Sequence, residues 1–294
     1  MTLKSSLIAG AAALALAACT PGAPGEAPEP AAADTGEAAV PALYADVLDC
    51  GTIQISDLDG FSSAGDYAGQ PATFTNTCYL IHHPEGRLLW DLGLPGLLRQ
   101  AGPLTQDIFT VSLDATLTEQ FEALGLTAGD IDYISISHSH FDHIGQADQV
   151  LGATWLVHQA ELDVMIPADG SAPQTTADQA ALFAAFAGFE REAFTGEKDV
   201  FGDGSVIIFE TPGHTPGHTS LQLTLPETGP VLLTGDLYHR TASRDLRRVP
   251  RFNYNEAQTL AAMEAFEARA ADLGAKVIIQ HERSDIEPLG GVIR

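Results

Sequence analysis

Apolar residues along this chain recur with two spacings, one typical of strands and one typical of amphipathic helices. Strand-like runs cover 77–82, 87–91, 132–137, 154–158, 205–209, 219–225, 231–234 and 276–280. The first two are separated by His-Pro-Glu-Gly, which predicts a hairpin. Helical spacing predicts helices over 117–124, 176–186 and 256–273. Strands and helices mixed in this order favour an α/β (α+β) fold, in which helices cover layered sheets.

The first residues depart from this pattern. Lys4 precedes an apolar run from Leu7 to Ala18, which is shorter than the ~20 residues that span a bilayer. Such a run is typical of a secretory signal peptide. It ends in Leu-Ala-Ala-Cys19, which resembles a bacterial lipobox. The resemblance implies that residues 1–18 are a signal peptide of the lipoprotein type and that lipid on Cys19 attaches the protein to a membrane. Ordinary signal cleavage, with Cys19 incidental, is the alternative.

Residues 19–42 are rich in Ala, Pro, Gly and Glu and contain no aromatic residue. A segment of this composition cannot bury enough apolar surface to offset the entropy of ordering it, so we expect a disordered tether. The folded domain is expected to cover 43–294. With a lipid anchor before the tether, the expected location is the cell envelope, on the periplasmic face of the outer membrane.

Composition restricts the partners. The net charge of −25 results from 39 acidic and 14 basic residues, and no segment forms a basic stripe. Because phosphate backbones repel such a chain, we expect no nucleic-acid partner. Cys50 and Cys78 lie within the predicted domain. In an oxidising compartment they can form a disulfide, but both occupy strand-like contexts, in which buried free thiols are equally expected.

The strongest chemical signal is a cluster of ligand-type residues directly after the apolar strand 132–137. It reads His138-Ser-His140-Phe-Asp142-His143. Two histidines at alternate positions share one side as the strand ends, and the following turn can bring Asp142 and His143 to the other side of a small cavity. Imidazole and carboxylate are ligands that suit zinc and neighbouring divalent metals. The cluster therefore predicts a metal site.

With this cluster the sequence resembles the metallo-β-lactamase superfamily, whose signature is His-x-His-x-Asp-His. The resemblance extends in family order to Thr-Pro-Gly-His214, Thr-Gly-Asp236 and Ile-Ile-Gln-His281. It implies a four-layer αβ/βα sandwich with a dinuclear metal site at the open edge between two sheets. It further implies two ligand groups joined by a bridging carboxylate: one ion on His138, His140 and His214, the other on Asp142, His143 and His281, and Asp236 between them.

The implied cofactor is a pair of divalent metal ions, which supply hydroxide near neutral pH and polarise the substrate. Zinc is the first expectation, with cobalt, manganese and iron as alternatives because such sites accept several metals. The predicted catalytic residues are Asp142, Tyr238 and His239. Tyr238 and His239 directly follow the bridging carboxylate, so either can assist the leaving group or the developing oxyanion.

The remaining histidines of the predicted domain need a separate interpretation. His218 follows the ligand His214 by four residues, and we interpret it as supporting the ligand loop by hydrogen bonding. His82, His83 and His158 lie outside the motifs, and we interpret them as structural.

The substrate is a separate question, because this superfamily hosts many reactions. A bridging aspartate argues against the true β-lactamases. Segments 78–81, 89–95, 235–239 and 249–253 resemble the N-acyl-homoserine lactone lactonases, except that their tyrosine three residues after the bridging aspartate is replaced by His239. The leading hypothesis is lactone ring opening by metal-bound hydroxide. Hydrolysis of organophosphate triesters, aryl esters or thioesters on the same scaffold is the alternative.

Two further expectations follow from the same set of residues. A non-catalytic, metal-binding lipoprotein is a third hypothesis, but a binding module has no need for a bridging carboxylate and two complete ligand groups. The resemblance to the lactonases also makes a homodimer an expectation, because dimers are common among them.

Overall fold

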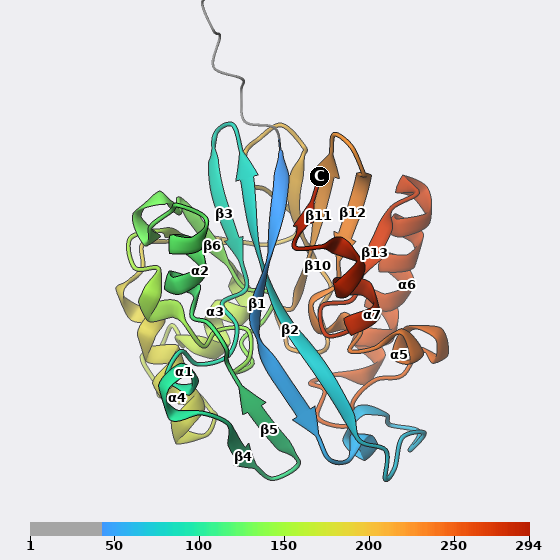
Figure 1. Cartoon of the computed structure of the whole chain (residues 1–294). Helices are drawn as coiled ribbons and strands as arrows, with labels where there is room; N and C mark the ends of the chain where they lie inside the picture. Colours follow the sequence, from blue (N-terminus) through green and yellow to red (C-terminus); the bar gives the residue numbers. More distant parts are fainter. Residues whose placement is uncertain (1–42) are drawn as a thin grey trace, which may run out of the picture. The chain divides into compact units, whose positions relative to one another are not determined.

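A computed structural model describes residues 43–294, which form two β-sheets packed face to face with helices on both outer sides (Figure 1). The predicted signal peptide, Cys19 and the tether lie outside the described residues. Among residues 43–294, no helix is both long enough and apolar enough to cross a bilayer.

The first sheet has nine strands in the order β4-β5-β1-β2-β3-β6-β7-β8, with β14 paired to β1. Its central pair is β1 and β2, which run antiparallel, whereas β3, β6, β7 and β8 are parallel. The bounds are β1 (Tyr44–Ile55), β2 (Ala72–His83), β3 (Gly86–Trp90), β4 (Leu104–Gln106), β5 (Phe109–Ser112), β6 (Tyr133–Ser135), β7 (Thr154–His158), β8 (Arg191–Phe194) and β14 (Val292–Ile293).

The second sheet has five strands in the order β13-β12-β11-β10-β9. They are β9 (Lys198–Asp199), β10 (Val206–Glu210), β11 (Thr219–Leu225), β12 (Gly229–Leu233) and β13 (Lys276–Ile278). The last two are parallel, so β12 and β13 end at the same edge. Residues that follow these ends are therefore brought together.

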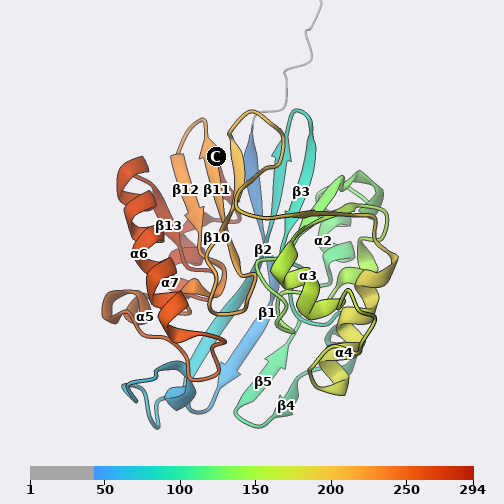
Figure 2. The same ribbon diagram turned by 180° about the vertical axis from the view of Figure 1, so that it is seen from behind.

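Helices cover the two sheets from opposite sides (Figures 1 and 2). On the first sheet lie α1 (Leu98–Ala101), α2 (Leu117–Ala123), α3 (Gln159–Met165) and α4 (Ala177–Ala184). Beside the second sheet lie α5 (Thr241–Leu246), α6 (Glu256–Leu273) and α7 (Arg283–Ile286). The predicted four-layer sandwich is confirmed.

Burial of apolar side chains explains why the layers stay together. Between the sheets, Trp90 and Tyr79 pack with Leu221 and Leu233 in a fully buried cluster. A second cluster joins the first sheet to its helices, and a third joins the second sheet to Met263 and Phe266 of α6. Each fully buried large side chain contributes about 1.5–3 kcal/mol relative to exposure, so these clusters are the main stabilising contribution.

Cys50 of β1 and Cys78 of β2 form a disulfide. Both residues are fully buried, and the bond links the two central strands. Of the two alternatives left open by the sequence, the disulfide is therefore the one found in the structure.

Candidate metal centre

The seven predicted ligands converge at one edge of the sandwich, although they come from four separate segments. The loop after β6 supplies the first four, the loop between β10 and β11 supplies His214, and the residues after β12 and β13 supply Asp236 and His281. Because β6, β12 and β13 all deliver their carboxyl ends to this edge, distant segments meet there.

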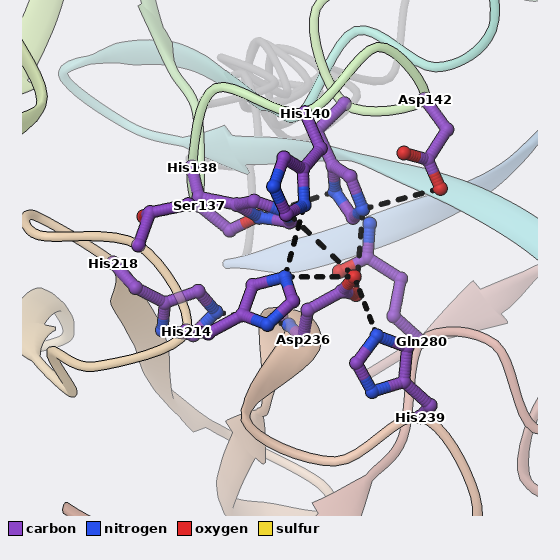
Figure 3. A network of polar contacts seen from close by, with 12 residues as sticks. Ser137, His138, His140, Asp142, His214, His218, Asp236, His239 and Gln280 are labelled. Atoms are coloured by element: carbon purple, nitrogen blue, oxygen red, sulfur yellow. Dashed lines mark hydrogen bonds and ion pairs between the residues drawn. The ribbon is translucent and has the colours of Figure 1, made fainter. Parts of the chain in front are cut away.

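The ligands form two groups. Triad A consists of His138, His140 and His214, and triad B consists of Asp142, His143 and His281. Within each group, with Asp236 counted in triad A's group, the ligand atoms lie within 4.8 Å of one another. Figure 3 shows triad A beside Asp236, with Asp142 on the far side of the cluster.

Asp236 lies between the triads and divides its two oxygens between them. Its Oδ2 is 3.6 Å from His138 Nε2 and 3.5 Å from His214 Nε2. Its Oδ1 is 2.9 Å from His281 Nε2 and 3.3 Å from His143 Nε2. A carboxylate in this position is suited to bridge two ions.

Backbone geometry fixes Asp236 in that position. Gly235 has φ +54, and a Cβ there would lie 2.8 Å from His218 Nε2, so only glycine fits without strain. The backbone N–H of Asp236 donates to His218 Nε2 at 2.9 Å. The Nδ1 of His218 contacts Thr211, in accordance with the supporting role predicted for His218. Burial lowers the pKa of His218 to about 4, so the ring is neutral and can accept this bond.

Hydrogen-bonding partners at Nδ1 of three ligand imidazoles direct Nε2 into the cluster. His214 Nδ1 lies 3.3 Å from Asn253 Oδ1, His281 Nδ1 lies 2.8 Å from the Thr75 carbonyl, and His143 Nδ1 lies 2.9 Å from Asp91 Oδ2. In each case Nε2 is the free nitrogen. Such partners set the tautomer and orientation of metal ligands.

The residues fit a pair of cations. His140 Nδ1 is 2.9 Å from His138 Nε2 and 3.0 Å from His214 Nε2, so three ring nitrogens converge on one point. Among the described residues, His143 Nε2 and Asp236 Oδ1 are buried and make no hydrogen bond of suitable geometry, although they lie 3.3 Å from each other and Asp236 Oδ1 lies 2.9 Å from His281 Nε2. Converging lone pairs and unpaired buried polar atoms are costly unless a cation lies between them.

The protonation of the two triads differs. Burial lowers the pKa of His138, His140 and His214, which leaves neutral rings with available lone pairs. Burial also acts on His143 and His281, but the nearby carboxylates of Asp236 and Asp142 outweigh it and raise the pKa of both. Burial would raise the pKa of Asp236, yet the surrounding histidines, beginning with His281, hold it well below the usual range.

Tyr238 and His239 lie on opposite sides of the chain after the bridging aspartate. The Tyr238 hydroxyl donates to Glu267 at 2.9 Å, and its ring packs edge-on against Phe266 in the core under α6. His239 Nε2 lies 3.1 Å from Asp236 Oδ2 and lines the cavity beside the cluster. The Tyr238 hydroxyl is thus directed to Glu267, whereas His239 lines the cavity, and the catalytic roles of both residues stay predictions.

The three histidines interpreted as structural each pair with a carboxylate away from the cluster. His82 lies 2.8 Å from Asp46, His83 lies 3.0 Å from Asp203, and His158 lies 2.8 Å from Glu210. These contacts account for all three by ordinary polar pairing.

Sequence reasoning assigned no role to Asp91, which is fully buried at the end of β3. It accepts hydrogen bonds from the Ser137 backbone N–H and hydroxyl and from Gln280 Nε2, besides its contact with His143. The signal available in the sequence was a charged residue at the end of the predicted strand 87–91, directly before Leu-Gly.

An apolar cavity of about 290 Å³ opens beside the cluster. Its apolar lining comprises Ile53, Ile55, Phe61, Phe74, Phe109, Phe141 and Phe252, and its polar lining comprises His140, Asp142, Asp236, His239 and His281. Phe61 and Phe252 meet edge-on with ring centroids 5.2 Å apart. The cavity thus places apolar surface directly against the candidate metal ligands.

Relatives of known function share much of this domain. The chain is 26% identical over 220 residues to the N-acyl homoserine lactonase AttM of Azorhizobium caulinodans, covering 69% of this chain and 80% of the relative. It is 29% identical over 215 residues, with the same coverage, to AttM of Rhizobium radiobacter.

Solved structures have the same fold. A quorum-quenching N-acyl homoserine lactone hydrolase superposes with a TM-score of 0.70 at 20% identity, covering 84% of this chain and 95% of that one. The dizinc quorum-quenching lactonase AidC superposes with a TM-score of 0.62 at 19% identity, covering 85% and 89%. Residues 72–281, which contain all seven predicted ligands, match the metallo-beta-lactamase superfamily, and the chain belongs to that family.

Proposed function

We propose that this protein hydrolyses the lactone ring of N-acyl-homoserine lactones at a dinuclear metal centre. The observation that carries the proposal is the placement of an apolar cavity against two triads that share Asp236. The names of the relatives favour the same substrate class.

Triads A and B would hold two divalent ions with Asp236 between them, zinc being the first expectation. When bound, such ions supply a hydroxide nucleophile near neutral pH and polarise the carbonyl that it attacks. The chain's part is to hold seven ligand atoms in place through buried hydrogen bonds, so that little reorganisation is needed during the reaction.

The cavity would take the acyl chain. Five phenylalanines and two isoleucines offer an apolar lining, and burying a methylene contributes about 0.8 kcal/mol. A chain held there leaves the polar end of the substrate among His140, Asp142 and Asp236. The same lining excludes water from the reacting bond, which strengthens its electrostatic interactions with the site.

His239 would assist departure of the ring oxygen. Its ring packs edge-on against Phe61, with centroids 5.3 Å apart, and against Phe252, at 6.0 Å. This packing holds Nε2 at the boundary between the cavity and Asp236. A proton held at Nε2 is in position to be donated to an oxygen that leaves from a substrate in the cavity.

The test offers an N-acyl-homoserine lactone, an aryl ester and an organophosphate triester in parallel to the purified protein after its metals have been counted. Dominant lactone turnover with two ions per chain supports the proposal. Faster ester or triester turnover with two ions keeps the centre and moves the function to the alternative. A protein that binds no ions contradicts the metal centre itself.

We also propose that lipid on Cys19 attaches the protein to the outer membrane on its periplasmic face. The apolar run that ends in Leu-Ala-Ala-Cys19 supports this. The buried Cys50–Cys78 disulfide also supports export, because such bonds persist in oxidising compartments. A Cys19→Ser variant is expected to move from the membrane to the soluble fraction, and an unchanged distribution contradicts the anchor.

A further inference from the structure

Glu161 is a buried carboxylate that belongs to neither triad. It lies in the first turn of α3 and is only 1% exposed. Its Oε1 accepts the Ser139 backbone N–H at 2.7 Å, and its Oε2 accepts the Thr215 hydroxyl at 2.8 Å and the Gly217 N–H at 2.9 Å. A buried charge is costly unless several donors satisfy it, and here three do.

The three donors come from the two loops that carry triad A. Ser139 stands between His138 and His140, and Thr215 directly follows His214. His140 and His214, on these two loops, are 74 residues apart in the sequence, and one carboxylate joins the loops. Its bonds span 22 residues to the first loop and 54 and 56 residues to the second.

Packing reinforces this junction. A Cβ at Gly217 would lie 2.3 Å from the Glu161 backbone nitrogen, so the second loop rests directly on the start of α3. The Ser139 carbonyl accepts a hydrogen bond from Gln179 of α4, so the peptide groups on both sides of Ser139 are fixed. Helices that cover the first sheet therefore position ligands on two loops. One loop follows β6 of the first sheet, and the other lies between β10 and β11 of the second sheet.

We propose that Glu161 is a positioning residue for the ion held by triad A. Its two oxygens hold the His138–His140 loop and the His214 loop at the spacing that brings three ring nitrogens to one point. This inference rests on the metal centre proposed above, though not on the choice of substrate.

The hydrogen bonds of Glu161 reach no residue of triad B, although Asp142 and His143 lie on the same loop as Ser139. The histidines of triad B are held by Asp91 and by the Thr75 carbonyl. The effect of removing the Glu161 charge should therefore be confined to one ion, which a general loss of stability would not produce.

Glu161→Gln is the direct test, because it replaces one hydrogen-bond-accepting oxygen with an NH₂ group, which can only donate. At least one of the three hydrogen bonds to residue 161 is then lost. We expect affinity for one ion to fall by about 10- to 100-fold, the usual effect of losing such a supporting partner. The second ion should stay bound. Zinc alone is the probe. The full chain is equilibrated with zinc at increasing chelator concentrations, and the zinc ions bound per chain are counted by elemental analysis. Circular dichroism and thermal melting on the same samples report whether the variant is folded.

Two additional substitutions identify which ion has gone. At chelator concentrations that strip the weakened ion from Glu161→Gln, adding His214→Ala is expected to remove nothing further, whereas adding His281→Ala should remove the remaining ion. The matched control is Glu267→Gln, since Glu267 also accepts three hydrogen bonds, from Tyr238 and Arg244, but touches neither ligand loop. It should keep both ions at wild-type affinity.

Thr215→Val keeps the test decisive if Glu161→Gln fails to fold. It removes one hydroxyl bond to Glu161 and preserves side-chain volume, so a smaller loss of affinity for the same ion is expected. Unchanged zinc affinity in both variants, or equal loss of both ions, overturns the proposal. Failure of the wild-type chain to bind two ions contradicts the proposed metal centre instead.

Discussion

Triads A and B share Asp236 but are supported in different ways. Triad A consists of three imidazoles with lowered pKa values, and its loops are held at the backbone by Glu161. Triad B contains the carboxylate of Asp142, and its His143 ring is held directly by Asp91. The same residue type therefore has its pKa lowered on one side and raised on the other, according to the carboxylates around it.

This difference shows how one sandwich can hold two sites that are separable by mutation. The loops of triad A are held by Glu161 and Gln179, from helices that cover the first sheet, and by Asn253 before α6. The histidines of triad B are held from β2 and the end of β3. Asp236 faces both triads, and the Ser137 hydroxyl also contacts both, at 3.0 Å from His138 Nδ1 and 3.2 Å from His143 Nδ1. Substitutions should therefore divide into those that affect both ions, one ion or neither.

Asp236→Ala should have the largest effect. It removes both oxygens that face the triads, so we expect loss of tight binding for both ions and a fall in turnover of about a thousand-fold, the upper range for loss of one electrostatic group in an active site. Ion counts and lactone turnover on the same sample check this. Full activity with two ions still bound would contradict a shared carboxylate.

His239→Phe should lower turnover without removing either ion. Phenylalanine retains the aromatic packing against Phe61 and Phe252 but holds no proton, so a loss of about 100-fold is expected, the lower range for a general acid. The measurement is kcat beside metal content. Wild-type kcat would exclude His239 from the reaction, and loss of an ion would identify it as a ligand.

Asp91→Asn should act mainly on triad B, because Asp91 contacts His143 directly and reaches His138 only through Ser137. An amide cannot accept from Ser137, Gln280 and His143 together, so His143 loses its fixed tautomer and one ion should bind about 10- to 100-fold more weakly. The buried donors left unpaired should also cost about 1–3 kcal/mol of unfolding free energy. Together with Glu161→Gln, this variant tests whether the two ions respond separately; loss of the same ion in both would refute the division.

Much of the fold was predictable because most strands are short, uninterrupted apolar runs, and α6 coincides with the predicted range 256–273. No range was predicted for the long strand β1, beyond the strand-like context of Cys50. Asp46 and Asp49 interrupt its apolar pattern, and the register shifts between Asp49 and Gly51. Only pairing with β2, β5 and β14 explains why these residues form a strand.

The ligands could be predicted because four local motifs contain them, whereas their supports, apart from His218, could not. Asp91 and His143 are 52 residues apart, and Glu161 meets Thr215 54 residues away. No local pattern specifies such contacts, because they arise only when the sheets and helices have packed. Hydrogen bonding by Asn253 to the Gly213 carbonyl and Thr259 is another case, since it links the His214 loop to the start of α6.

The smallest effect is expected from Tyr238→Phe. Adjacent residues in extended backbone point to opposite sides, and Tyr238 is extended, with φ −134 and ψ 129. Its hydroxyl therefore faces Glu267 while His239 faces the cavity. Removing one hydrogen bond should lower the unfolding free energy by about 1 kcal/mol and leave both ions and turnover unchanged. The measurements are the thermal melting temperature and kcat. A large fall in kcat with unchanged metal content would show that Tyr238 takes part in the reaction. The segment after Asp236 would then have to rotate when substrate binds.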